Sequence, residues 1–226
     1  MLKSKGIFAV LTIALFFTAC KKNNSGNNPT NNPPSSADCK ACVYTPDCVN
    51  ISYTYQDQIA SSAATTRVIT YSSLSDTSIG GIVYQKITTP TGNSYQNCDN
   101  GVTTSISYNA VGTSGSTVAE IKVVPLKANG TVGTTWTDHV TSGGGQDNQF
   151  DYTIEEKGIS RVVLGVTFTN VIHVTAMLSV NYMGTNVPEG QVEYYYAQGI
   201  GLIESTTTIS GSLYESTYLK TYSIPN

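Results

Sequence analysis

Apolar and polar residues alternate along most of the chain after residue 50. Tyr53 and Tyr55 alternate with serine and threonine, and Ile106 and Tyr108 alternate with serine. Successive side chains of a strand point to opposite faces, so this period of two predicts strands that bury one face. The same pattern predicts further strands at residues 82–87, 118–124, 150–156, 160–166, 170–182, 192–197, 201–208 and 212–222.

Short groups of turn-forming residues separate these segments. They occur at Asn129-Gly130, Glu156-Lys157-Gly158, Pro188-Glu189-Gly190 and Ser210-Gly211. Such residues tolerate the backbone angles that tight hairpins require. Residues 56–66, where alanines cluster, are the best candidate for a helix. We therefore expect one all-β domain, a strongly curved or partly open antiparallel barrel or half-barrel, with at most one or two short helices.

The first residues have the form of a secretory signal. Two lysines precede an apolar run at residues 7–17, and Thr18-Ala19-Cys20 follows. The run is about half as long as a membrane-spanning helix needs to be. Phe17-Thr18-Ala19-Cys20 resembles the bacterial lipobox, which predicts removal of residues 1–19 and lipidation of Cys20. The alternative is ordinary signal cleavage with Cys20 as a structural cysteine.

Residues 20–37 are predicted to be the lipidated cysteine and a tether. After Cys20 the segment consists mainly of Asn, Pro, Ser and Gly, with too little apolar surface to fold. The β domain then occupies residues 38–226. The two or three acyl chains of a bacterial lipoprotein make its membrane attachment durable. We therefore expect a location in the cell envelope, with the outer membrane as the anchoring membrane.

The charge of the chain argues against nucleic acid as a partner. The full chain has 12 Lys and Arg against 15 Asp and Glu, a net charge of -3. Removing Lys3 and Lys5 with the signal leaves 10 against 15, a net charge of -5. Binding to phosphates needs clustered cations, and the sequence contains no basic patch.

Four cysteines follow Cys20, namely Cys39, Cys42, Cys48 and Cys98. An even number in an exported protein favours two disulfides, and three connectivities are possible. One alternative is a zinc site, although zinc ligands usually form two close pairs and Cys98 stands alone. The other is a redox-active Cys39-x-x-Cys42 motif, although the βαβ pattern that usually surrounds such a motif is absent.

Candidate catalytic residues are few. His139 follows Asp138, but adjacent strand residues point to opposite faces, so the two cannot easily hydrogen-bond. His173 is expected to be a partly exposed strand residue. Glu193 and Glu204 could be paired across a hairpin, but a solvated strand face explains them more simply. Hydrolase and nucleotide-binding motifs are absent. We therefore expect no catalytic residues, metal site or cofactor, and a protein that is not an enzyme.

One stretch resembles a known group of proteins. Residues 195–203, Tyr-Tyr-Ala-x-Gly-Ile-Gly-Leu-Ile, are similar to the strand-turn-strand ending of uncharacterised bacterial envelope lipoproteins related to open-barrel carriers. Gly133 to Trp136, Gly165 to Val174, and the Cys39 to Cys48 segment agree with the same group. The resemblance implies a curved antiparallel sheet around an apolar surface. The related carriers bind acyl chains in a concave apolar face covered by helices.

These observations lead to a membrane-anchored lipoprotein that binds an apolar ligand or an envelope protein partner. Trp136, Tyr194 and Tyr196 are the candidate ligand-binding residues, and the competing interpretation is that they only fill the core. A second hypothesis is a structural or adhesive surface protein. A third is a hydrolase with its site in the loops, which clustered carboxylates or a histidine pair in a cleft would support.

Overall fold

The computed structural model describes residues 39–40, 42–48, 51–60, 62–70, 77–89, 92–111, 117–141 and 147–223. The predicted signal peptide, the lipidation site at Cys20 and the tether lie outside these residues. In the described part, all regular secondary structure is β-strand. Within this part, the chain forms no helix that is long and apolar enough to cross a membrane.

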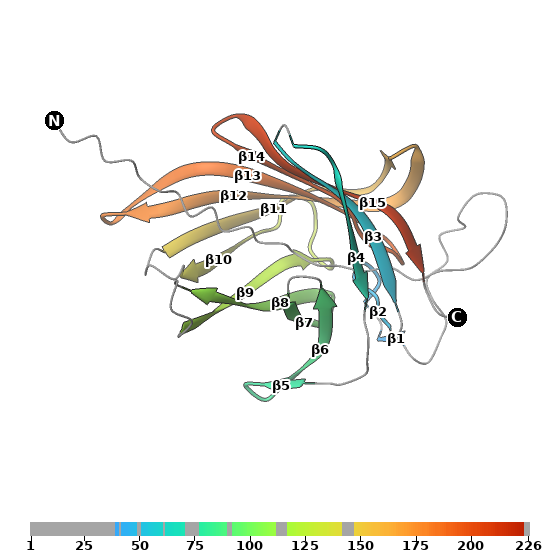
Figure 1. Cartoon of the computed structure of the whole chain (residues 1–226), viewed down its shortest axis with the longest axis horizontal. Coiled ribbons are helices and arrows are strands. Elements are labelled where there is room, and N and C mark those ends of the chain that lie inside the picture. Colours follow the sequence, from blue (N-terminus) through green and yellow to red (C-terminus); the bar gives the residue numbers. More distant parts are fainter. Residues whose placement is uncertain are drawn as a thin grey trace.

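The strands form one long antiparallel sheet and a small separate hairpin (Figure 1). The strands are β1 (Cys39–Lys40), β2 (Asp47–Cys48), β3 (Ser52–Ile59), β4 (Thr65–Thr70), β5 (Thr77–Ile79), β6 (Ile82–Thr89), β7 (Gly92–Asp99), β8 (Val102–Val111), β9 (Thr117–Lys127), β10 (Thr135–Thr141), β11 (Asp147–Val163), β12 (Val166–Tyr182), β13 (Thr185–Ala197), β14 (Gly201–Ile209) and β15 (Ser212–Ser223). The large sheet has the order β10-β11-β12-β13-β14-β15-β3-β4-β6-β7-β8-β9, with β5 paired to β6, and β1 pairs with β2.

The large sheet curves back on itself. In Figure 1, β11 to β15 lie above β6 to β9, and β3 and β4 connect the two parts at one side. The strands at the two ends of the order, β9 and β10, are in contact. No register pairs them among the described residues, so backbone ladders do not close the barrel. This arrangement confirms the predicted all-β, partly open antiparallel barrel.

Side-chain bonds join β9 to β10 where a ladder does not. The Trp136 indole Nε1 donates to the Val124 carbonyl at 2.6 Å. The Val124 N–H donates to the Asp138 carboxylate at 2.5 Å. Because Trp136 and Asp138 lie on the same face of β10, one strand satisfies both backbone groups of Val124 with side chains. We call this junction the seam.

The buried residues of the described part form two core clusters that share β11 to β14 and use alternate residues in β13. The seam cluster comprises Ile121, Val123, Leu126, Trp136, Val140, Phe150, Tyr152, Ile154, Ile172, Val174, Ala176, Tyr194, Tyr196 and Leu202. The end cluster comprises Ile51, Tyr53, Tyr55, Ile69, Ile87, Val163, Phe168, Val171, Tyr195, Ala197, Ile200, Ile203 and Leu219. Tyr194 and Tyr195 therefore pack into different clusters, which requires apolar residues on both faces of β13.

The helix suggested for residues 56–66 is wrong. Residues 56–59 form the end of β3, Ala60 has a left-handed φ of +45°, and residues 65–66 begin β4. In β3, Gln56 pairs with Tyr218 of β15 on one side and with Thr66 of β4 on the other. Pairing on both sides satisfies the backbone, and the weak helix propensity of a few alanines does not compete with it.

Two of the four predicted turns are also wrong. Glu156-Lys157-Gly158 lies inside β11, where the register with β12 shifts just before the triplet, at residue 155, and again within it, at Gly158. Pro188-Glu189-Gly190 lies inside β13 and contains another register shift, at Glu189. Both are bulges, in which an extra residue bends a strand without reversing the chain.

The chain instead reverses at Leu164-Gly165 and Met183-Gly184. The segment predicted as a strand at 160–166 therefore contains the end of β11 and a hairpin turn. The turns predicted at Asn129-Gly130, between β9 and β10, and at Ser210-Gly211, between β14 and β15, are confirmed.

Candidate functional site

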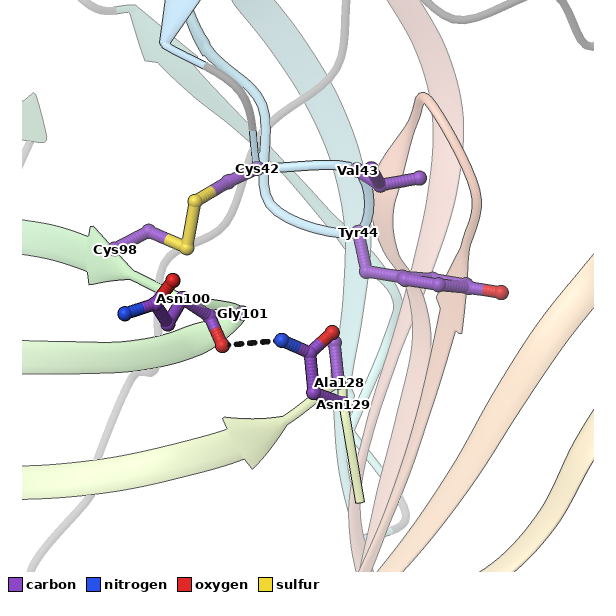
Figure 2. A pocket seen from close by; sticks show the side chains of 8 residues that line it. All are labelled: Cys42, Val43, Tyr44, Cys98, Asn100, Gly101, Ala128 and Asn129. Carbon is purple, nitrogen blue, oxygen red and sulfur yellow. Dashed lines mark hydrogen bonds between the residues drawn. A yellow bond between two sulfur atoms is a disulfide. The ribbon is translucent and has the colours of Figure 1, made fainter. Parts of the chain in front are cut away.

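A pocket of about 490 Å³ lies beside the turn between β7 and β8 (Figure 2). One wall is the segment that precedes β3, and another is the loop that follows β9. The lining residues are Cys42, Val43, Tyr44, Cys98, Asn100, Gly101, Ala128 and Asn129.

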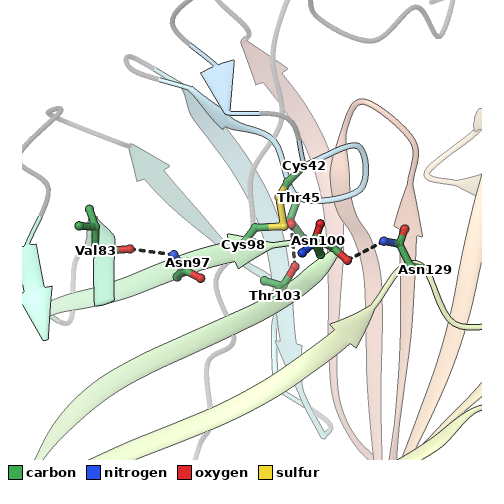
Figure 3. The surroundings of a disulfide bond; sticks show 8 residues. All are labelled: Cys42, Thr45, Val83, Asn97, Cys98, Asn100, Thr103 and Asn129. Atoms are coloured by element: carbon green, nitrogen blue, oxygen red, sulfur yellow. Dashed lines mark hydrogen bonds between the residues drawn. A yellow bond between two sulfur atoms is a disulfide. The ribbon is translucent and has the colours of Figure 1, made fainter. Parts of the chain in front are cut away.

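The first wall is held against the sheet by three bonds. Cys42 forms a disulfide with Cys98 of β7 (Figure 3). Three residues further along, the buried Thr45 hydroxyl hydrogen-bonds the Thr103 hydroxyl of β8 at 2.7 Å. Between them, the Val43 carbonyl accepts a hydrogen bond from Gly199 N–H, in the turn between β13 and β14. The wall is therefore tied to both parts of the curved sheet.

The opposite side of the pocket is formed by two turns that bond to each other. Asn100 and Gly101 adopt left-handed backbone angles, with φ of +46° and +73°. Gly101 accepts a hydrogen bond from Ala128 N–H at 2.7 Å, and the Asn129 amide donates to the Asn100 carbonyl at 2.6 Å. A Cβ on residue 101 would lie 2.8 Å from the Asn129 side chain. Glycine is therefore required by both the backbone angle and the close approach.

The lining suits an uncharged ligand with an apolar face. Val43, Ala128 and the disulfide provide apolar surface, and the amides of Asn100 and Asn129 provide donors and acceptors. Burial raises the pKa of the Tyr44 phenol, so this hydroxyl stays protonated. Among the described residues that line the pocket, none is an acid, histidine, lysine or arginine. The pocket can therefore bind by packing and hydrogen bonding.

Comparison with known proteins identifies similar folds only. No family model matches the chain, and no curated protein matches it. One similar structure is a Bacteroides fragilis protein described as exported and as having a YmcC-like fold. It has a TM-score of 0.47 and 9% identity, over 80% of this chain and 99% of that one. Another, a Parabacteroides distasonis protein described as a lipoprotein, has a TM-score of 0.48 and 13% identity, over 81% and 99%.

The structure brings the four predicted disulfide cysteines to the pocket end of the domain. The bond between Cys42 and Cys98 confirms a disulfide for that pair. Cys39 and Cys48 are register partners in the β1 and β2 hairpin. Sulfurs that are bonded to each other are not thiolate ligands, so Cys42 and Cys98 do not form the zinc site that was the alternative.

The three aromatic residues proposed from the sequence lie elsewhere, in the seam cluster. Trp136, Tyr194 and Tyr196 are all buried. Trp136 stacks on Tyr152 with ring centroids 5.1 Å apart, and Tyr194 stacks on Tyr196 at 6.2 Å. None of the three lines the pocket, and their role as ligand contacts stays a prediction.

The histidines do not form a shared site. His139 is exposed, and its Nδ1 lies 3.1 Å from Asp147, while the neighbouring Asp138 bonds to Val124 in the seam. This geometry confirms that Asp138 and His139 point apart. His173 is partly buried, as expected for a strand residue, and its ring stacks on Tyr195 at 4.3 Å.

The two glutamates considered as a carboxylate pair have separate partners. Glu204 bonds Arg161 through both carboxylate oxygens. Glu193 accepts hydrogen bonds from Gln191 and Tyr195. Each carboxylate therefore has a local structural role.

Sequence reasoning missed Tyr44, Asn100 and Asn129 as lining residues. The available signal was the repeated Asn-Gly dipeptide, at Asn100-Gly101 and Asn129-Gly130. Each dipeptide predicts a turn, but only the fold shows that the two turns meet beside the cysteines.

Proposed function

We propose that this protein is a lipid-anchored envelope lipoprotein whose β domain binds a small uncharged ligand without catalysing a reaction. The signal sequence and Cys20 support the anchor. The pocket between the disulfide segment and the two Asn-Gly turns supports ligand binding. The proposal rests on this pocket, because its lining combines apolar surface with hydrogen-bonding groups.

The lining also supports binding over catalysis. General acid and base catalysis needs a group that exchanges protons near neutral pH. The described lining offers amides, aliphatic groups and a phenol whose pKa is raised by burial. A hydrolase would need its catalytic groups elsewhere, and the Glu193 and Glu204 carboxylates described above each bond to a different structural partner.

The place of the pocket fits a tethered binding protein. Cys42, Val43 and Tyr44 belong to the segment that follows the predicted tether, so the ligand would bind at the end of the domain nearest the anchor. An apolar ligand against Trp136, Tyr194 and Tyr196 is less favoured, because those side chains already pack against one another. A structural or adhesive role is the competing function, and it needs no ligand in the pocket.

Native mass spectrometry of protein purified from its own envelope tests ligand binding. Val43→Trp fills the pocket from its rim, and Val187→Trp is a matched control far from it, because the two valines are 44% and 45% exposed. We expect a small molecule to copurify with wild type and with Val187→Trp, and to be lost from Val43→Trp. An empty wild-type protein, or equal retention by both variants, would overturn the binding proposal.

A separate variant tests the anchor. Cys20→Ser removes the acceptor of the lipid and leaves the β domain unchanged. We expect folded protein to appear in the soluble fraction after cell lysis. Tight membrane association of the folded variant would show that attachment does not depend on Cys20.

A further inference from the structure

The hairpin end between β11 and β12 presents an apolar tip. Val162, Leu164 and Val166 are all exposed there, at 62%, 49% and 40%. Residues 162–170 include no charged side chain. The three side chains surround the tip: Val162 and its partner Thr167 lie on one face of the hairpin, Val166 and its partner Val163 lie on the other, and Leu164 is in the turn. Water solvates such an apolar tip poorly.

The backbone at this tip adds a second cost. Leu164 has φ +46° and precedes Gly165 at φ +83°, so both central residues of the turn are left-handed. Asn, Asp and Gly adopt this conformation most readily, whereas leucine is disfavoured there. Both solvation and backbone conformation therefore favour a polar residue at position 164. A contact made by the leucine side chain would account for its presence.

The tip is held in a defined position. Just before it, Arg161 bonds Glu204 of β14, and its guanidinium lies 4.0 Å from the ring centroid of Tyr195 of β13. Val163 and Phe168 are buried in the end cluster. The hairpin base is thus fastened to β13 and β14, and the exposed side chains project from a rigid support.

This tip lies at the end of the domain from which the chain leads toward Cys20. Val163 belongs to the same cluster as Ile51, which directly precedes β3. In Figure 1 the β11 and β12 hairpin end is at the right, on the side of β1 and β2, and the β12 and β13 hairpin end is at the left. Residues 21–38 can span at most about 65 Å when extended. As a random coil the predicted tether has an end-to-end distance of only about 25 Å, about half the roughly 55 Å length of the 17-residue strand β12. A lipid at Cys20 therefore keeps the nearer end of the domain closer to the bilayer than the far end.

We propose that Val162, Leu164 and Val166 insert into the interface of the membrane that holds the lipid anchor. This inference rests on the proposed anchor at Cys20. A lipid surface is the fitting partner because the tip is apolar and uncharged, and because the tether brings that end of the chain to the membrane. The hairpin would then orient the tethered domain, with the disulfide end facing the bilayer.

The opposite hairpin provides a matched control. Tyr182 and Met183 at the β12 and β13 turn are 62% and 88% exposed, and Met183 also has a left-handed φ, of +51°. This tip is likewise apolar, but it lies at the far end of the domain. The two tips therefore have similar exposed apolar side chains and differ in their distance from the predicted anchor, which is shorter for the β11 and β12 tip.

Tryptophan quenching in vesicles tests the contact. Lipidated Val162→Trp and Tyr182→Trp proteins are reconstituted in phosphatidylcholine vesicles with brominated acyl chains, and Trp136 contributes the same background to both. The two replaced residues are equally exposed, at 62%. We expect strong quenching for Val162→Trp and only background quenching for Tyr182→Trp. Failure of either protein to float with the vesicles would instead defeat the anchor.

A second substitution shows whether the apolar tip itself makes the contact. Adding Leu164→Asn to Val162→Trp places a residue that suits the left-handed turn, so folding is retained. We expect quenching to fall at least roughly twofold, because the inserted apolar surface is reduced. Two results would contradict insertion of the tip. One is a Val162→Trp protein that floats with the vesicles but is not quenched, and the other is a Leu164→Asn substitution that leaves the quenching unchanged. Self-association through the tip in place of quenching would also overturn it.

Discussion

Arg161 and Glu204 are 43 residues apart in sequence, and the Arg161 guanidinium donates two hydrogen bonds of 2.7 Å to the Glu204 carboxylate. The bidentate pair connects the folded-over end of β11 to β14. The hydrogen bonds that Arg161 donates to Glu204 are the main reason that the pKa of Arg161 is raised above its ordinary value. Glu204 is only 7% exposed, so the pair links a buried carboxylate to a partly exposed cation.

Arg161→Ala should destabilise the domain by about 2 kcal/mol, because it leaves a buried carboxylate without its cation. The partial exposure of Arg161 keeps this figure below the cost for a fully buried pair. Urea unfolding with the disulfides intact measures the change. Arg161→Ala combined with Glu204→Gln should recover part of the loss, since no unpaired buried charge remains. Equal stability of the single and double variants would argue against that explanation.

Strands with clear alternation, such as β12 and β15, were predictable because alternation is a local property, whereas β4, β7 and β10 were missed. In β12, Ile172, Val174 and Ala176 recur at every second residue and are all fully buried. The positions of chain reversal were less predictable. Gly158 and Gly165 have φ of +73° and +83°, yet the first lies in a bulge and the second in a turn. Glycine reports a left-handed angle, and the pairing partners decide whether the chain reverses there.

The candidate pocket could not be predicted for a different reason. Its walls come from three separate stretches, around residues 42, 100 and 128, and the contacts between them depend on how far the sheet curves. Even cysteine number predicted disulfides, whereas the pairing of Cys42 with Cys98 needed the fold. Aromatic residues such as Trp136 attracted attention, but large aromatic side chains also dominate packed cores.

Disulfide mapping should find Cys42 bonded to Cys98 and Cys39 bonded to Cys48. The first pair is present in the structure, and the second pair is predicted because its residues are opposite each other in the β1 and β2 register. Mass spectrometry of peptides cleaved without reduction identifies both. Free thiols at Cys39 and Cys48, or a bond between either and another cysteine, would contradict the second assignment.

Replacing both Cys42 and Cys98 with serine should cost about 4 kcal/mol of stability, because the bond closes a long loop in the unfolded chain. Their sequence separation is 56. Chemical unfolding of this double variant and of wild type provides the comparison. A loss confined to ligand binding, with stability unchanged, would indicate that the bond shapes only the pocket.

Asp138→Ala should open the seam between β9 and β10. The substitution removes the acceptor for Val124 N–H, which we expect to cost about 1–3 kcal/mol and to speed hydrogen exchange at that amide. Asp138→Asn keeps an acceptor oxygen and should have a smaller effect. The neighbouring Thr137→Ala removes only an exposed bond to Asp151 and serves as the control. Unchanged exchange at Val124 in Asp138→Ala would argue that the backbone contact does not depend on this carboxylate.

Glu215→Gln should stabilise the domain near neutral pH. Burial, with repulsion from Asp57 in addition, raises the pKa of Glu215 above 4.5, and Arg67 partly opposes this. The folded state therefore holds the proton more tightly than the unfolded state. The stability that protonated Glu215 contributes is fully present below pH 4.5 and is lost as the pH rises through the pKa of Glu215 in the folded state. Melting temperatures should favour Glu215→Gln at neutral pH and converge with wild type in acid, unlike those of the exposed control Glu120→Gln.

Leu164→Asn and Met183→Asn should each leave the domain as stable as wild type, or stabilise it by up to about 1 kcal/mol. Both residues have left-handed backbone angles in hairpin turns followed by glycine, where asparagine is favoured. Thermal unfolding of the unlipidated protein measures both effects. We expect a similar gain in stability at the two turns, because the backbone strain is the same in both. Loss of membrane contact only for Leu164→Asn would then show that only this tip contacts the membrane. Destabilisation by Leu164→Asn alone would instead mean that the leucine packs within the domain.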